Sequence, residues 1–220
     1  MVGSQSAGKS SLLEQIVGID FLPRGSGVVT RRPLELRLTY DPKLKQAEAR
    51  FDEIPGEKFT DFNKVRDKIN FVTDKVCGNN KNIVDKPIIL NISSPSCPTI
   101  TIVDLPGITA NPVGDQPKNI YEITKGLVMN YANDPRSIII CVIPANQDIS
   151  TSEALKLVME VDPKGVRSLG CLTKIDIMNR GDNARNILLN QEVELKYGFV
   201  GIKNRNNQDV IDNKPVSKSL

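Results

Sequence analysis

Residues 3–11 have the sequence GSQSAGKSS, and this stretch decides the fold class that we predict. Gly3, Gly8, Lys9 and Ser10 match the pattern G-x-x-x-x-G-K-[ST] of a phosphate-binding loop. The glycines let the backbone curl so that several N–H groups point at phosphate oxygens. A helix expected from about Lys9 adds the positive end of its dipole. A chance glycine- and serine-rich turn before a helix would give the same letters, so the motif needs support from the rest of the chain.

The overall composition is that of an ordinary globular domain. The chain has 220 residues, of which 39% are hydrophobic and 25% charged, enough for one core. A net charge of only +3 argues against a nucleic-acid-binding protein, which usually has a concentrated basic face. There is no histidine, which excludes histidine-based catalysis and histidine-ligated metals. No apolar run approaches the roughly 18 residues of a membrane span, and the first residues lack the features of a signal peptide.

Apolar strand-like runs alternate with helical patterns, which predicts an α/β fold with a mostly parallel central sheet flanked by helices. The expected strands are residues 34–39, 88–93, 99–104, 137–143, 168–173 and 199–203. The polar segment 41–60 is expected to be an exposed excursion with a short hairpin. The polar tail after Asn207 is expected to have little structure. Four cysteines without a Cys-x-x-Cys pair are expected to be small buried hydrophobes in a reducing compartment.

Helical patterns lie between the expected strands. Apolar residues at three- and four-residue steps predict a helix from Phe62 to Val76. Pro117 suits the first turn of another helix. Ser150 and Glu153 resemble a capping box at the start of a third.

Two further motifs support the phosphate loop. In TIVDLPG, Asp104 ends a strand, where its carboxylate can hold Mg²⁺ through water, and the N–H of Gly107 can contact a γ-phosphate. Lys9 is expected to reach the β- and γ-phosphates, and the hydroxyl of Ser10 to ligate Mg²⁺. Thr30 lies between the two motifs, where a second Mg²⁺-ligating hydroxyl is expected.

The third motif, CLTKID, places Lys174 and Asp176 after another apolar strand. A carboxylate there can accept both hydrogen-bond donors of guanine, a pair that adenine lacks, and so select GTP over ATP. An adenine-specific ATPase or kinase is an alternative that Asp176 disfavours. The order of the three motifs predicts a Mg²⁺-dependent GTPase.

Over essentially its whole length, the sequence resembles the GTPase domain of the dynamin superfamily. The resemblance is carried by GSQSAGKSSLLEQIVGIDFLPRGSGVVTRRPLEL, VDLPGITANPVGDQPKNI, ANQDISTSEALKLVMEVDPKGVRSLGCLTKIDIMNRG and YGFVGIKNRNNQD. It implies a three-layer P-loop GTPase fold for residues 1–220. It also implies that the family's stalk and lipid-binding regions lie outside this sequence.

The resemblance further implies a cytoplasmic, peripherally membrane-associated enzyme that hydrolyses GTP to GDP and self-assembles during membrane remodelling, fission or vesicle traffic. Two GTPase domains would form a homodimer through their nucleotide faces, which switches on hydrolysis. Microtubule binding recurs in the family, but no feature of the sequence argues for it independently. The alternative is a GTP-dependent scaffold with little hydrolysis.

Residues at positions that contact GTP in the family are Gly3, Ser4, Gln5, Ser6, Ala7, Gly8, Lys9, Ser10, Ser11, Gly107, Thr173, Lys174, Asp176, Asn204 and Arg205. Two departures from the family pattern lie in the expected base-binding loop. Lys203 stands where a small apolar residue is usual, and Asn207 stands where glutamine is usual. The match to the family pattern is therefore weaker in this loop than at Lys174 and Asp176.

The attacking water needs a group that orients it. In small GTPases a glutamine after the Asp-x-x-Gly glycine does this, but here that position is Ile108, which has no polar side-chain atom. The resemblance implies that Gln5 takes over, helped by the backbone around Thr30. Arg31 and Arg32 remain open as arginine fingers, solvated residues or dimer contacts.

The resemblance assigns two further catalytic features. Ser6 and the backbone carbonyls of Gly25 and Gly27 would bind a monovalent cation, K⁺ or Na⁺, that neutralises charge in the transition state. Asp148 would reach across the dimer to the partner's catalytic elements. From the residues alone, Asp148 is a solvated loop carboxylate near a helix start.

Only Met1 and Val2 precede Gly3, whereas typical strands run about five or six residues. The resemblance implies a longer strand here and a helix before it. We therefore expect the first strand to be largely missing and the isolated chain to have low stability, which thermal melts with and without upstream residues would test.

Overall fold

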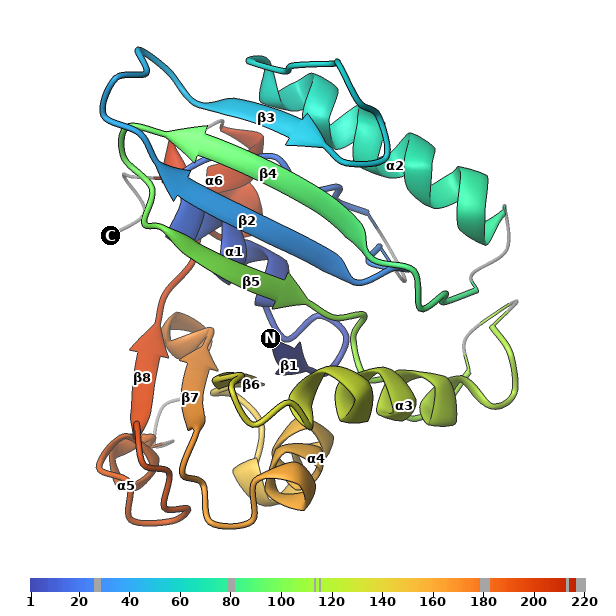
Figure 1. Cartoon of the computed structure of the whole chain (residues 1–220). Helices are drawn as coiled ribbons and strands as arrows, with labels where there is room; N and C mark the ends of the chain where they lie inside the picture. The colour runs from blue at the N-terminus through green and yellow to red at the C-terminus, as the bar shows by residue number, and fades with distance from the viewer. Residues whose placement is uncertain are drawn as a thin grey trace.

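The computed structural model describes residues 1–25, 29–78, 82–112, 114, 116–178, 183–212 and 214–216. Within these residues, strands lie in two four-stranded groups with helices packed on both faces (Figure 1). The all-parallel group has the order β1 (Val2–Gly3), β6 (Ile139–Pro144), β7 (Ser168–Thr173), β8 (Phe199–Ile202). The mixed group has the order β3 (Glu48–Phe51), β4 (Ile88–Ser94), β2 (Leu34–Tyr40), β5 (Ile100–Asp104).

The two groups meet at β1 and the loop that follows β5. The N–H of Ile108 donates to the carbonyl of Gly3 at 3.1 Å, and the N–H of Gln5 donates to the carbonyl of Ile108 at 3.2 Å. These bonds are those of a parallel bridge. β1 has only two residues, as expected, yet it lies at the centre of the combined sheet.

Six α-helices occur in the described residues: α1 (Lys9–Val17), α2 (Phe62–Cys77), α3 (Ile120–Ala132), α4 (Glu153–Val161), α5 (Arg185–Leu188) and α6 (Asn207–Ile211). Two single 3₁₀ turns cover Ile149–Thr151 and Ile175–Ile177. Among the described helices, none combines the length and apolar composition that crossing a membrane requires.

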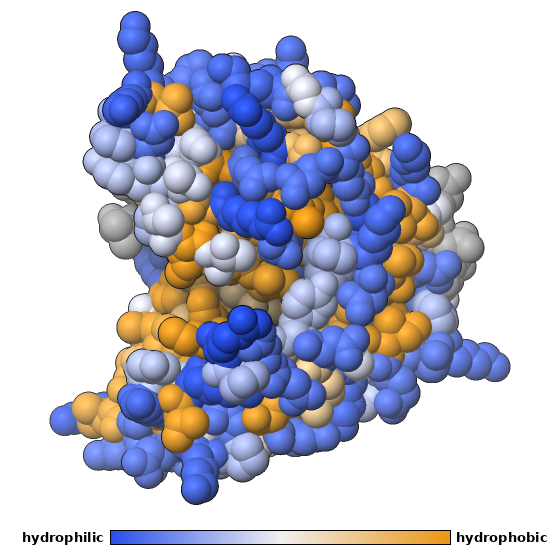
Figure 2. All heavy atoms as spheres, viewed as in Figure 1, coloured by the Kyte–Doolittle hydropathy of each residue, from blue (hydrophilic) through white to orange (hydrophobic). Residues whose placement is uncertain are grey.

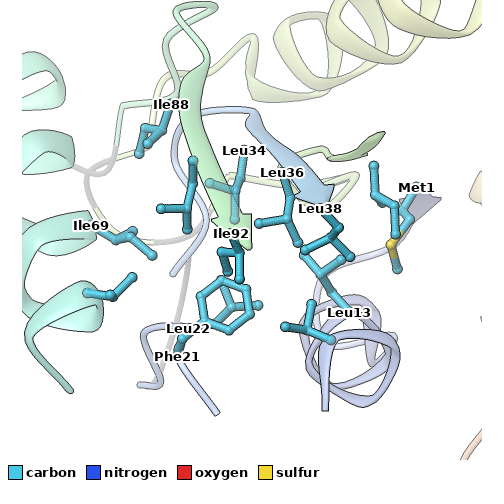
Figure 3. Packing of buried hydrophobic residues seen from close by; sticks show 14 of the residues in the cluster. Met1, Leu13, Phe21, Leu22, Leu34, Leu36, Leu38, Ile69, Ile88 and Ile92 are labelled. Carbon is cyan, nitrogen blue, oxygen red and sulfur yellow. The ribbon is translucent and has the colours of Figure 1, made fainter. Parts of the chain in front are cut away.

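The core lies on both faces of the sheet. On one face, Leu13 of α1 and Ile69 of α2 point toward Leu36 and Ile92 of the mixed strands (Figure 3). On the other face, α3 and α4 pack against β1 and β6. Successive residues of β6 pack alternately into the core on one face of the sheet and on the other, as the two-residue period of a strand requires. The three-layer α/β prediction is therefore confirmed.

A mostly apolar groove of about 460 Å³ lies beside β1. Ile138 and Ile100 line it and are 61% and 45% exposed. On this face of the molecule, hydrophobic atoms gather around a hollow between two largely hydrophilic parts (Figure 2). Next to its shortest strand, the sheet thus presents apolar side chains to solvent.

The six predicted strands and the helix over 62–76 are confirmed, but three local expectations were wrong. Segment 41–60 forms the expected short hairpin, since Ala49 pairs antiparallel with Phe59, but the segment is not simply exposed, because Ala49 and Phe51 of β3 are buried. The tail forms α6, because Asn206 begins it with a capping box. The cap of α4 is Ser152, whose hydroxyl accepts the N–H of Leu155 at 3.2 Å.

All four cysteines are free and buried, as predicted. Pro117 precedes α3 by one turn, and its carbonyl accepts the N–H of Ile120 at 3.0 Å.

Arg32 is a structural residue of the fold. Its side chain is fully buried, and its guanidinium donates to the carbonyls of Lys86 at 2.7 Å and Val72 at 2.9 Å while pairing with Glu53. It thus ties the start of β2 to α2 and to the segment before β4. The solvated and dimer-contact interpretations are wrong for Arg32, because its charge is satisfied inside the protein.

The variant Arg32→Lys keeps the charge but loses the planar fork that reaches three elements at once. We expect it to lower the free energy of unfolding by about 2–4 kcal/mol, measured by urea denaturation. Arg37→Lys is the matched control, because Arg37 is 44% exposed and should cost less than about 0.5 kcal/mol. Equal losses in the two variants would contradict this role of Arg32.

Candidate functional site

A cleft of about 670 Å³ opens where the strands β1, β7 and β8 end. Ligands of open α/β sheets bind at this carboxyl edge. Predicted site residues that line the cleft are Gln5, Ser6, Ala7, Gly8, Lys9, Ser10, Ser11, Gly25, Thr30, Gly107, Thr173, Lys174, Asp176, Asn204 and Arg205. Gly3, Ser4 and Asp104 are not part of this lining, and Gly27 lies outside the described residues.

The phosphate loop is a tightly curled backbone around a buried lysine. Ser6 has φ +61° and Gly8 has φ +97°. Both values lie in the left-handed region, which is energetically unfavourable for any residue other than glycine. Lys9 is 7% exposed, and its ammonium donates to the carbonyls of Gly3 at 3.2 Å and Ser4 at 3.5 Å. Burial lowers the pKa of Lys9, and the charge of Asp104 partly opposes this.

Close backbone approach explains two of the glycines. A Cβ on Gly3 would lie 2.8 Å from the carbonyl oxygen of Val142 in β6. A Cβ on Gly107 would lie 2.7 Å from the Cα of Gln5. The phosphate loop and the loop after β5 therefore touch through their backbones, and only glycine fits at Gly107.

Asp104 lies beneath the loop and is 1% exposed. Its Oδ1 has no hydrogen-bond partner among the described residues. Burial raises the pKa of Asp104, whereas the charge of Lys9 and a hydrogen bond with Ser10 lower it. A buried carboxylate oxygen without a donor suits a hydrated Mg²⁺ ion, which prefers oxygen ligands. Ser10, Thr30 and Asp104 line one small cavity next to the cleft, so the three predicted Mg²⁺ ligands lie together.

At the end of β7, Thr173 anchors the phosphate loop to the sheet. Its buried hydroxyl donates to the carbonyl of Ala7 at 2.6 Å, so it is already occupied by the protein. Lys174 has φ +60°, another strained backbone at the site. Asp176 follows it in a 3₁₀ turn, and the buried Oδ1 of Asn204 has no partner among the described residues.

Arg205 is held by two carboxylates that the sequence did not single out, Glu14 and Asp20. Its guanidinium lies 3.1 Å from Asp20 and 3.7 Å from Glu14, and Arg24 contacts both carboxylates as well. Burial and a hydrogen bond with Asp20 raise the pKa of Glu14 to about 7. Burial alone would raise the pKa of Asp20, but the hydrogen bond with Glu14 and two arginines lower it to about 2.

Four residues that the sequence analysis considered for catalysis do not line the described cleft. Asp148 is exposed, lies outside the described lining of the cleft, and caps a 3₁₀ turn by accepting the N–H of Ser150 at 2.9 Å. The side chain of Ile108 has no polar atom and is buried in the core, so it cannot orient a water. Arg31 donates to the carbonyl of Gly78 at 2.9 Å and pairs with Asp74. Neither Arg31 nor Arg32 is among the described residues that line the cleft, which gives no support to an arginine finger.

Comparison with known proteins decides the family. A family model described as "Dynamin family" matches residues 1–175. The chain belongs to the dynamin family. It is 47% identical over 225 residues to Dynamin-A of Dictyostelium discoideum and 47% identical over 220 residues to Dynamin-2 of Homo sapiens. It is 45% identical over 232 residues to Dynamin-1-like protein of Danio rerio.

These alignments cover all of this chain but only part of each dynamin relative. The share is 26% of Dynamin-A, 25% of Dynamin-2 and 34% of Dynamin-1-like protein. The chain thus spans about a quarter to a third of the length of these relatives. The alignments confirm the resemblance that the sequence motifs indicated.

The contact between Gly107 and Gln5 leads to a prediction for this dynamin-family site. In Gly107→Ala the new methyl group forces the two loops apart, and we expect the affinity for GDP to fall about tenfold or more. Gly126→Ala is the control, since Gly126 lies in α3 with open space around it. It should leave affinity unchanged and stabilise by about 0.5–1 kcal/mol. Fluorescence titration with GDP measures the difference, and unchanged affinity in Gly107→Ala would refute the constraint.

Proposed function

We propose that residues 1–220 form a dynamin-type GTPase domain whose cleft binds GTP with Mg²⁺ and hydrolyses it. The observation that carries the proposal is the buried, unpartnered Oδ1 of Asp104 beside Ser10 and Thr30, directly beneath the phosphate loop. A buried carboxylate oxygen without a hydrogen-bond donor is costly unless a ligand satisfies it. Mg²⁺ held there would neutralise charge that develops on the β- and γ-phosphates.

The rest of the cleft supports GTP as the substrate. Lys9 would offer an ammonium to the phosphates, and the curled backbone around Ser6 and Gly8 would supply N–H donors. Asp176 lines the opposite end of the cleft, where its carboxylate would accept the two donors of guanine. Lys174 lies beside it and would cover the base.

Gln5 is the proposed water-positioning residue. It lines the cleft and its backbone is held against Gly107, while the usual position, Ile108, is part of the core. Ser6 and the carbonyls of Gly25 and Gly27 are the proposed ligands of a K⁺ or Na⁺ ion. That cation would supply the positive charge that other GTPases take from an arginine finger.

The proposed catalytic unit is a homodimer formed through the nucleotide faces. Asp148 is exposed outside the cleft, which is compatible with contact to a second copy. In this proposal it steadies the partner's catalytic loops, and its own 3₁₀ turn holds it in place.

The proposed role of the whole protein follows from the dynamin family. We propose a cytoplasmic protein that associates peripherally with membranes through regions outside this sequence, forms higher oligomers, and uses GTP in membrane fission or vesicle traffic. Association with microtubules is a further family-based proposal. A scaffold that binds GTP with little hydrolysis is the alternative.

The test is turnover of GTP and ATP against protein concentration, in K⁺ and in a non-coordinating cation. The proposal predicts GTP-specific, K⁺-dependent hydrolysis that rises more than linearly with concentration. Binding of GTP without turnover would favour the scaffold. A turnover rate per chain that does not depend on the monovalent cation or on the protein concentration would contradict the dimer mechanism.

The two functions of the phosphate loop separate in two variants. Gln5→Glu removes the amide that orients water, so hydrolysis should fall about 100-fold while GTP affinity changes by less than about threefold. Lys9→Ala should damage both, because it removes charge from the phosphates. GDP and GTP titrations beside single-turnover rates measure the split. Normal hydrolysis by Gln5→Glu would refute the role of Gln5.

A further inference from the structure

Five charged side chains form a cluster next to the base end of the cleft. We call Glu14, Asp20, Arg24, Arg66 and Arg205 the arginine–carboxylate cluster. They come from α1, the segment after it, α2 and the loop after β8. Arg24 and Arg205 also line the cleft.

Asp20 is the centre of the arginine–carboxylate cluster. Its Oδ1 accepts from Arg66 at 2.8 Å and from Arg24 at 3.1 Å. Its Oδ2 accepts from Arg205 at 3.1 Å. One carboxylate thus accepts hydrogen bonds from three guanidinium groups that belong to three segments of the chain.

Glu14 fixes the segment that carries these partners. Its Oε1 accepts the backbone N–H groups of Phe21 at 3.0 Å and Leu22 at 2.8 Å. Its Oε2 accepts from Arg24 at 2.6 Å. Because Glu14 is 2% exposed and belongs to the phosphate-loop helix, it sets the position of residues 20–24 relative to the phosphate loop.

The guanidinium of Arg205 makes its hydrogen bonds within the protein. Its side chain is only 8% exposed, and besides Asp20 it donates to the carbonyl of Lys214 at 3.0 Å. Its neighbours Asn204 and Asn206 line the cleft beside it. The guanidinium therefore acts as a tether for the loop at 204–206, which lines the cleft.

We propose that Asp20 is a positioning residue that acts through Arg205 and sets the affinity of the cleft for the guanine nucleotide. This proposal rests on the proposed function, namely that the cleft binds GTP. Asp20 holds Arg205, Arg205 holds the loop at 204–206, and this loop lines the cleft in which the base is proposed to bind. The hydrogen bonds of Asp20 with Arg24, Arg66 and Arg205 involve no residue of the phosphate loop at 3–11.

The alternative is direct contact between Arg205 and the nucleotide, with Asp20 serving only stability. The proposal and this alternative predict different nucleotide affinities for the double variant that lacks both Asp20 and Arg205. If Asp20 acts through Arg205, removing both should cost no more than removing one. If the residues act separately, their losses should multiply.

The test uses the full chain and the variants Asp20→Asn, Arg205→Gln and the double variant. We expect each single variant to weaken GDP binding about tenfold, and the double variant to weaken it about tenfold as well. In GTP turnover, KM should rise by the same factor while kcat changes by less than about twofold. Arg37→Gln is the control for losing an ion pair away from the cleft, and should change neither quantity.

Losses in the double variant that multiply to about a hundredfold would overturn the proposal, as would unchanged GDP affinity in Asp20→Asn. A parallel fall of kcat would do the same, because it would show damage to the whole site. If Asp20→Asn does not give a cooperative melt, Asp20→Glu replaces it, with an expected threefold effect that is also non-additive with Arg205→Gln. If the wild-type chain does not bind GDP, the proposed function fails instead, so the two failures are distinct.

Discussion

The backbone junction between the phosphate loop and the loop after β5 is the constraint on which the rest of the structure depends. Two hydrogen bonds link Ile108 to Gly3 and Gln5, and they join the two groups of strands into one sheet. The same junction presses Gly107 against Gln5 and places Asp104 beneath Lys9. Because these groups are placed by backbone contacts, their geometry depends little on side-chain flexibility.

A pair of opposite charges is buried at this junction. Burial penalises the charged forms of both Lys9 and Asp104, and each charge partly stabilises the other. An apolar pair of similar size would usually be at least as stable. Retaining the charges therefore makes physical sense if the site receives phosphate and a metal ion, as we propose. The polar Gln5 and Ser6 lie in the same loop and give it chemical groups beyond those that phosphate binding requires.

The sequence predicted those parts of the fold and site whose chemistry is local. Three segments could be recognised in this way: the phosphate loop, the strand that ends in Asp104 and the strand before Lys174. In each, polar motif residues lie next to an apolar run, so the sequence predicted that all three meet at one site. The tether of Arg205 could not be predicted, because it depends on residues 14, 20, 24 and 66, which only the tertiary structure brings together.

Other misses have similar causes. β3 looked polar because only two of its residues, Ala49 and Phe51, face the core. Ser150 had the spacing of a helix cap, but it belongs to a 3₁₀ turn, and the helix begins after Ser152. A signal for Glu14 existed in the sequence: it is a carboxylate three residues before Val17 on the buried face of α1.

We propose that this cleft is a guanine-nucleotide site completed by Mg²⁺ at Asp104. Calorimetric titration with GTP and with ATP, in the presence and absence of Mg²⁺, measures both properties. We expect one GTP per chain, bound at least about 100-fold more tightly than ATP and more tightly still with Mg²⁺. Equal affinity for the two nucleotides, or GTP binding that is indifferent to Mg²⁺, would contradict it.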